Sequence, residues 1–145
     1  MVLDQDFWLA IQKDEEANLA LSPEEAELLE SVHRMGWRSY PLFINGRAGS
    51  GKSTMLQYLA ADYVDFSLRR DLSHLPLYMT CSRDLLERAR TTVRGLLTRH
   101  HKRLYEGAHD PAEVDGILGR CFVVFHDFLY SLLPADMQNE FPREQ

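Results

Sequence analysis

The chain has 145 residues, of which 45% are hydrophobic and 26% are charged, and its formal net charge at pH 7 is −6. This length predicts a single domain with a substantial core, and the composition is typical of a soluble globular protein. No apolar stretch approaches the roughly 20 residues that span a bilayer, and the acidic start lacks the features of a signal peptide, so we expect a cytoplasmic protein without a membrane partner. The negative net charge argues against a general nucleic-acid binder.

Two helices are expected at the start of the chain. Within residues 3–16, apolar side chains recur at the spacing of an amphipathic helix. Ser22 and Glu25 form a capping box, and Pro23 between them suits the first position of a helix. This second helix should end at Gly36.

A glycine-rich stretch follows, and from Gly46 to Ser53 it fits G-x-x-x-x-G-K-[ST], the phosphate-binding loop of P-loop NTPases. It lies between an expected buried strand, Tyr40–Asn45, and an expected helix, which is the context that makes the motif credible. Glycines let backbone N–H groups approach an anion closely, and the positive end of the helix adds to the attraction. We expect Lys52 to be the catalytic residue that neutralises the β- and γ-phosphates, and the Ser53 hydroxyl to ligate Mg²⁺. The residues expected to contact the nucleotide are Gly46, Arg47, Ala48, Gly49, Ser50, Gly51, Lys52, Ser53 and Thr54.

Strands and helices alternate beyond this loop. The pattern predicts strands at Leu75–Thr80 and Cys121–Phe125, and helices that follow Ser82, span Pro111–Leu118 and run from Phe128 to Pro134. Alternation of this kind predicts an α/β fold, in which a parallel β-sheet is flanked by helices.

The distribution of charge and the cysteine positions add two expectations. Residues 1–30 hold nine acids and one base, whereas residues 82–103 hold seven bases and two acids. The second segment is compatible with attraction of a polyanion, although a charged helix face is usually only solvated. Cys81 and Cys121 each fall in an apolar context and are expected to be buried free thiols rather than a disulfide.

Three stretches resemble superfamily 1 helicases of the UvrD/Rep type. The loop is similar to that family's A-G-S-G-K-T. The stretch Leu77–Arg83, continued by Leu85–Arg90, resembles motif Ia, in which a strand ends in a Thr/Ser-rich turn and runs into a helix of the form A-A-x-E-M-x-x-R. The stretch Val124–Phe128 looks like the next element of the family, T-F-H-x-[FL].

The resemblance extends from Gly46 to Phe128, which is over half of the chain. It implies a RecA-like motor domain in which Lys52 and Ser53 hold Mg-ATP. It also implies a track for single-stranded nucleic acid, with DNA favoured over RNA. Such a track is physically plausible, because hydroxyls at strand ends can hold phosphates and an aromatic ring can stack on a base. The residues near this track would be Thr80, Ser82, Arg83, Phe125 and His126.

The chain departs from the family pattern at several points. Cys81 stands where motif Ia often has an aromatic residue, and Val124 stands in place of the threonine of the third element. Family members usually carry a glutamine ahead of the loop whose amide reads adenine, and Glu25 stands at that place. The acidic Walker B pair, the sensing arginines and the second motor domain lie further on in the family. The resemblance therefore implies one domain that is part of a larger protein, with residues 1–39 as a helical lead-in, residues 40–145 as a partial P-loop NTPase domain, and the remainder of the parent polypeptide as its partner.

Two other functions are compatible with the sequence. The first is a self-contained small P-loop kinase or NTPase in which Asp127 serves as the Walker B acid. His126 intervenes between Asp127 and the apolar run, and an acid that opens a helix is commonly an N-cap, so we favour the N-cap interpretation. The second is a non-enzymatic, nucleotide-gated regulatory module that uses the helix within residues 82–103 as a docking face.

Overall fold

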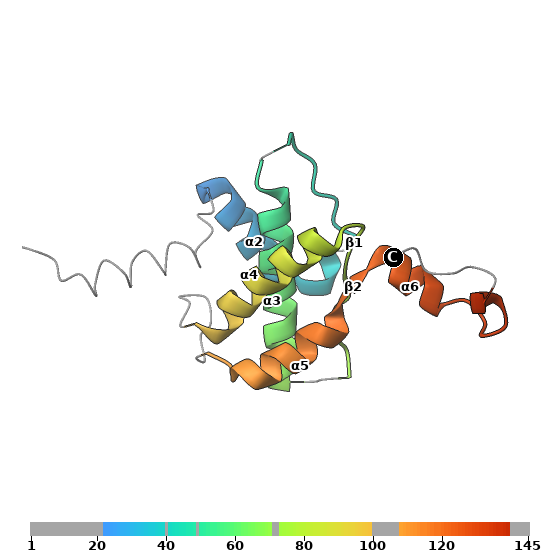
Figure 1. Ribbon diagram of the computed structural model, residues 1–145. Helices are drawn as coiled ribbons and strands as arrows, with labels where there is room; N and C mark the ends of the chain where they lie inside the picture. The colour runs from blue at the N-terminus through green and yellow to red at the C-terminus, as the bar shows by residue number, and fades with distance from the viewer. Residues whose placement is uncertain (1–21, 40, 49, 71–72, 100–107, 140–145) are drawn as a thin grey trace, which may run out of the picture.

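The computed structural model describes residues 22–39, 41–48, 50–70, 73–99 and 108–139 (Figure 1). The helix expected over residues 3–16 lies outside the described residues. In chain order the elements are α2 (Pro23–Met35), the 3₁₀ helix η1 (Gly36–Ser39), α3 (Lys52–Arg70), β1 (Tyr78–Thr80), α4 (Arg83–Thr98), α5 (Pro111–Cys121), β2 (Phe122–Val124), α6 (Phe125–Ser131) and the 3₁₀ helix η2 (Met137–Asn139). None of these helices is long and apolar enough to cross a membrane.

Local capping signals determine where the helices begin. The Ser22 Oγ accepts a hydrogen bond from the Glu25 N–H at 3.2 Å, and the Ser22 N–H donates to Glu25 Oε2 at 2.8 Å, so the predicted capping box is confirmed. Helix α2 ends at Gly36, as expected, where φ is 56°. Ser82 caps α4 as predicted, because its Oγ accepts from the Leu85 N–H at 3.4 Å.

Three helices, α3, α4 and α5, supply most of the core. Helix α4 packs against both α3 and α5, and Figure 1 shows it crossing α3. Five aliphatic side chains at this junction have an exposed fraction of 0%: Val64 of α3, Val93 and Leu97 of α4, and Val114 and Leu118 of α5. Because burial of each such side chain stabilises the fold by about 1.5–3 kcal/mol, the junction holds α3 firmly in place. Helix α3 is the element that begins at Lys52.

The two strands form a small parallel sheet. Tyr78 lies opposite Phe122 and Thr80 lies opposite Val124, and the Tyr78 and Phe122 rings stack with their centroids 4.7 Å apart. Helices α4 and α5 lie in the connection between the strands, where α4 packs against both strands and α5 packs against β2. The expectation of α/β structure with parallel strands and flanking helices is therefore confirmed in this coarse form, although most of the described chain is helical.

The first strand, expected at Tyr40–Asn45, is not formed over its described residues, 41–45. Residues 42–47 have no regular secondary structure, and Phe43, which we expected to be buried, has an exposed fraction of 86%. Leu42 and Ile44 on either side of it pack against the core. This alternation is that of an extended segment with one buried side, but a strand also needs a hydrogen-bonded neighbour. Among the described residues, the paired strands are β1 and β2 alone.

Three further expectations need correction around β2 and α4. The strand expected at Cys121–Phe125 is shorter, because Cys121 belongs to α5 and Phe125 belongs to α6. Helix α6 therefore begins earlier than the expected Phe128. Asp127 is not an N-cap, because it lies within the first turn of α6 and the N-cap is Val124. Cys81 is exposed, since it lies in the turn between β1 and α4, whereas Cys121 is buried as expected, and both thiols are free. Burial raises the pKa of the Cys121 thiol.

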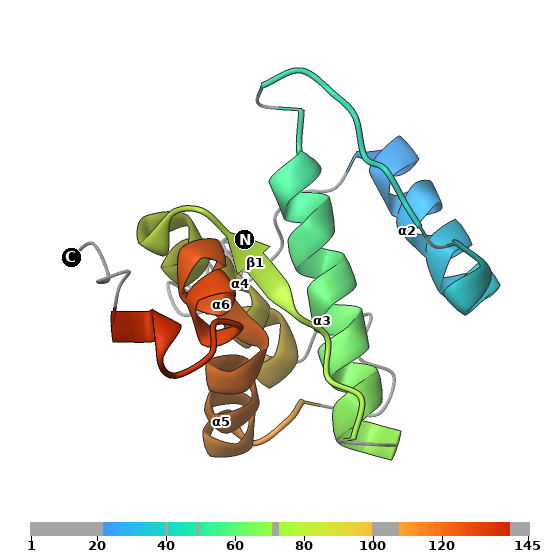
Figure 2. The same ribbon diagram turned by 90° about the vertical axis from the view of Figure 1, so that its right-hand side faces the viewer.

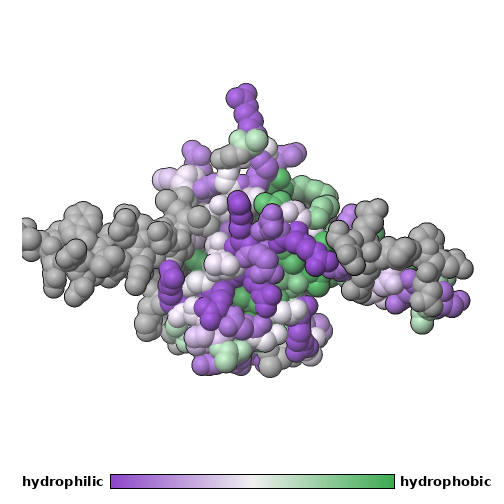
Figure 3. Space-filling view, in the orientation of Figure 1, coloured by the Kyte–Doolittle hydropathy of each residue, from purple (hydrophilic) through white to green (hydrophobic). Residues whose placement is uncertain are grey.

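One face of the sheet is open. Leu77 and Met79 point to the same side of the extended chain, and their exposed fractions are 46% and 42%. Met79 lies opposite the half-buried Val123 of β2, and we call these three side chains the outer sheet face. Figure 2 views the molecule from this side, with β1 drawn in front of α3, and Figure 3 shows apolar surface on the side where the strands lie. Parallel sheets are ordinarily covered on both faces, so this face is unusual for its class.

Candidate functional site

The glycine-rich loop leads directly into α3 and closes around the Lys52 ammonium group. Lys52 Nζ donates to the Gly46 carbonyl oxygen at 2.6 Å, to the Arg47 carbonyl oxygen at 2.5 Å and to Ser50 Oγ at 3.2 Å. The Ser50 N–H donates to the Arg47 carbonyl oxygen at 3.2 Å and tightens the turn. The predicted catalytic lysine therefore places its positive charge within the loop. Gly49, another expected contact, lies outside the described residues.

The end of the loop is shaped by Gly51. Its φ is 80°, a left-handed conformation that favours glycine, and Lys52 is the first residue of α3. The Gly51 carbonyl oxygen accepts from the Met55 N–H at 2.9 Å and begins the helical hydrogen-bond pattern. An α-helix has no internal partners for the N–H groups of its first turn, which here includes Ser53 and Thr54. Together with the Lys52 ammonium, these donors suit an anion such as a phosphate group.

Glu25 lies against this loop, and sequence reasoning missed the contact. A Cβ placed on Gly51 would lie 2.1 Å from Glu25 Oε1, so the carboxylate occupies the space beside that glycine. The capping box of α2 fixes the other carboxylate oxygen through the Ser22 N–H. The position of Glu25 ahead of the loop, at the place where the resembling family carries a glutamine, was the available signal that this residue lies near the loop.

The predicted nucleic-acid residues of the β1–α4 turn have local structural partners. Thr80 Oγ1 accepts from the Ser82 N–H at 3.0 Å and donates to the Ser82 carbonyl oxygen at 3.2 Å. The Ser82 hydroxyl caps α4. Both hydroxyls therefore stabilise the turn.

The structure brings this turn next to the start of α6. Thr80 lies opposite Val124, the residue before Phe125, because β1 and β2 run in parallel. Phe125 is outside the core, with an exposed fraction of 38%, and its ring meets the exposed His126 ring edge-on at a centroid distance of 6.2 Å. Arg83 and Asp127 connect the two segments through an ion pair of 3.5 Å. We call Thr80, Ser82, Arg83, Phe125 and His126 the strand-end site.

The pairing of Asp127 with Arg83 bears on the metal-ligand alternative. The Asp127 carboxylate pairs with the Arg83 guanidinium, and this ion pair joins the first turn of α6 to the first turn of α4. Within the described ranges, no group of three or more His, Cys, Asp or Glu side chains is arranged to hold a metal ion. The observed contact of Asp127 is therefore that of a bridging ion-pair partner.

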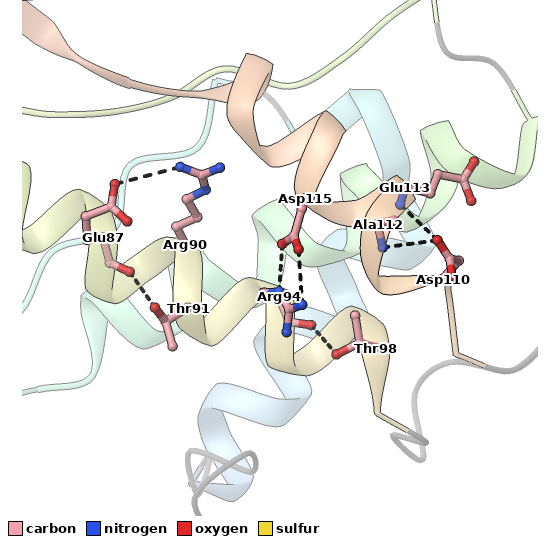
Figure 4. Close-up of polar contacts among 9 residues, drawn as sticks. All are labelled: Glu87, Arg90, Thr91, Arg94, Thr98, Asp110, Ala112, Glu113 and Asp115. Atoms are coloured by element: carbon pink, nitrogen blue, oxygen red, sulfur yellow. Dashed lines mark hydrogen bonds and ion pairs between the residues drawn. The ribbon is translucent and has the colours of Figure 1, made fainter.

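Acidic partners neutralise much of the basic helix α4 (Figure 4). Arg94 makes two hydrogen bonds to the Asp115 carboxylate of α5, at 2.6 and 3.1 Å, and Arg90 lies 3.8 Å from Glu87. The hydrogen bonds from Arg94 lower the pKa of the Asp115 carboxyl, and the same contact raises the pKa of the Arg94 guanidinium. The positive charge available to attract a polyanion is therefore smaller than the number of bases in residues 82–103 suggested, because Arg94 pairs with Asp115 and holds α4 to α5.

A second polar cluster lies towards the far end of α3 from the loop. The His109 Nε2 is 2.6 Å from Asp65 Oδ1, and the Arg69 Nε donates to the same oxygen at 2.9 Å. The His109 side chain has an exposed fraction of only 9%. The cluster joins α3 to the segment that leads into α5, and sequence reasoning did not predict it.

No protein family, curated protein or solved structure was found to match this chain.

Proposed function

We propose that this chain binds a nucleoside triphosphate with Mg²⁺ and forms the ATP-binding part of a superfamily 1 type helicase or translocase. The observation that carries the proposal is the loop from Gly46 to Gly51, closed around the Lys52 ammonium at the start of α3. Positive charge, the first-turn N–H groups of α3 and a left-handed glycine converge there. That combination fits a chain of phosphates better than any uncharged ligand.

The loop and the start of α3 would contact the nucleotide through three kinds of group. The N–H groups at the start of α3 would donate to phosphate oxygens, and Lys52 would exchange its contacts with the Gly46 and Arg47 carbonyl oxygens for contacts with phosphate. Ser53 is exposed in the first turn of α3, where its hydroxyl is available to a magnesium ion. The ion would supply charge neutralisation on the phosphates.

The helicase part of the proposal rests on the strand-end site and the outer sheet face. Ligands of open α/β sheets gather at the carboxyl ends of the strands, and Phe125 exposes an aromatic ring at that edge. The open apolar face of the sheet supports packing against further helices of a larger motor domain, because both faces of a parallel sheet are ordinarily covered by helices. We propose single-stranded nucleic acid and the remainder of a parent polypeptide as the two macromolecular partners.

Nucleotide binding is tested by titrating the protein with a fluorescent ATP analogue in the presence of Mg²⁺. Lys52→Ala should weaken binding at least about tenfold, because it removes the ammonium that faces the phosphates. Arg70→Ala is the matched control, since it removes one positive charge at the other end of the same helix and should leave affinity unchanged. Equal affinity of Lys52→Ala and the unmodified protein would contradict the proposed site.

A further inference from the structure

Glu25 is an acidic side chain that α2 holds beside the phosphate loop. Its Oε1 takes the space where a Cβ of residue 51 would lie, and its Oε2 accepts from the Ser22 N–H at 2.8 Å. Both carboxylate oxygens therefore have defined neighbours, one on the loop and one on the helix start. The capping box therefore fixes the orientation of the carboxylate beside Gly51.

A carboxylate in this place opposes the binding of an anion to the loop. Like charges separated by a few ångströms repel each other strongly where protein replaces part of the water. Lys52 offsets one negative charge, but the triphosphate and Glu25 would both lie beside the loop that holds this single ammonium. A divalent cation bound to the triphosphate changes this balance, because it lowers the ligand's net charge and attracts carboxylate oxygens.

We propose that Glu25 makes the loop selective for the metal-bound form of its triphosphate ligand over the metal-free form. This inference rests on the proposed function, namely that the loop binds a nucleoside triphosphate. Glu25 is then a specificity-determining residue that discriminates by the charge of the phosphate chain and not by the base. The predicted Mg²⁺ contact of Ser53 and the carboxylate of Glu25 would favour the same ionic form.

The test compares dissociation constants with Mg²⁺ and with EDTA, measured calorimetrically for ATP, GTP and inorganic triphosphate. Glu25→Gln removes the charge but keeps an oxygen that can accept from the Ser22 N–H, so the capping box is preserved. The matched control is Glu24→Gln, since Glu24 is exposed in the same first turn of α2 and is not the side chain that meets Gly51. Circular dichroism of both variants checks that α2 is intact.

We expect Glu25→Gln to lower the ratio of the metal-free to the metal-bound dissociation constant by on the order of tenfold, for ATP and for inorganic triphosphate alike. Most of this change should come from tighter binding of the metal-free ligand. Glu24→Gln should stay within about twofold of the unmodified protein, because exposed charges are screened.

Three results would overturn the inference. An unchanged ratio in Glu25→Gln, with measurable binding, shows that the carboxylate does not act on the phosphate chain. A changed preference between ATP and GTP with no effect on inorganic triphosphate places Glu25 at the base instead. Failure of the unmodified protein to bind any triphosphate with Mg²⁺ overturns the proposed function itself, and it is distinguished from the first result by the absence of measurable binding.

Discussion

Gly51 is constrained by its own backbone and by a neighbouring side chain. Its φ of 80° lies in the left-handed region, and the Glu25 carboxylate fills the space that a side chain would need. The same residue ends the loop and begins the hydrogen-bond pattern of α3. At the scale of single residues, the shape of the candidate phosphate site therefore depends on the absence of a Cβ at this position.

Gly51→Ala is expected to destabilise the protein and to weaken nucleotide binding. The left-handed conformation alone costs alanine about 1–2 kcal/mol, and displacement of Glu25 adds to the loss of free energy of unfolding. Urea denaturation measures the stability, and titration with the fluorescent ATP analogue measures the binding. In a Glu25→Ala background the same substitution should cost less, because only the backbone contribution remains.

Gly116→Ala provides the matched control for that substitution. Gly116 lies within α5, and a Cβ added there meets nothing within 4 Å. Alanine should therefore stabilise this helix by about 0.5–1 kcal/mol. If Gly51→Ala shifts the urea midpoint in the same direction as Gly116→Ala, then the described loop conformation is wrong.

At the scale of secondary-structure elements, α3 has polar contacts at both of its ends. Its first residue, Lys52, binds the loop carbonyl oxygens, and near its last turns Asp65 contacts both Arg69 and His109. His109 also donates its backbone N–H to the Leu97 carbonyl oxygen at 2.9 Å, which joins the segment before α5 to α4. The cluster therefore helps to fix the helix that presents the candidate phosphate site.

Asp65→Asn is expected to lower the free energy of unfolding by about 1–3 kcal/mol, because a largely buried imidazole and Arg69 lose their shared charged partner. The urea midpoint measures this loss. Glu87→Gln is the control, since it disrupts an exposed ion pair with Arg90 at 3.8 Å and should cost no more than about 1 kcal/mol. Equal effects of the two substitutions would show that the cluster contributes no more than a surface pair. Nucleotide affinity of the folded Asp65→Asn variant should be unchanged.

The elements that could be predicted from sequence are those specified by neighbouring residues. The capping box at Ser22, the N-cap at Ser82 and the proline at Pro111 predicted the starts of three helices, because such signals involve only residues a few positions apart. The prediction of a strand at Tyr40–Asn45 was wrong because a strand depends on residues far away in the sequence. Apolar alternation specifies which side of a segment is buried, but it does not specify a partner strand.

The candidate site was predictable to a similar extent. The loop residues follow from a local motif, whereas the approach of Glu25 to Gly51 depends on how α2 packs. The Asp65–His109 contact joins residues 44 positions apart and has no signature in the sequence. Likewise, the seven bases counted in residues 82–103 could not reveal that Arg94 pairs with Asp115.

At the scale of the whole molecule, charge limits how a nucleic acid could be held. The net charge is −6, and three arginines of α4 lie next to acids: Arg83, Arg90 and Arg94. Binding of a single strand at the strand-end site would therefore depend on few phosphate contacts, and stacking on Phe125 would supply more of the affinity than in a basic groove. We therefore expect the affinity for a single strand to depend only weakly on salt concentration.

This balance is testable with a fluorescent oligo-dT strand titrated at several salt concentrations. Phe125→Ala should weaken binding by about 1–3 kcal/mol and leave the salt slope unchanged, because an aromatic ring releases no counterions. Arg83→Gln should instead reduce the slope by about 0.7, the value for one phosphate contact on a single strand. Leu132→Ala is the control for lost apolar surface, since Leu132 is 63% exposed just beyond α6. A slope that changes with Phe125→Ala, or an affinity that falls equally with Leu132→Ala, would show that the strand does not bind at the strand-end site.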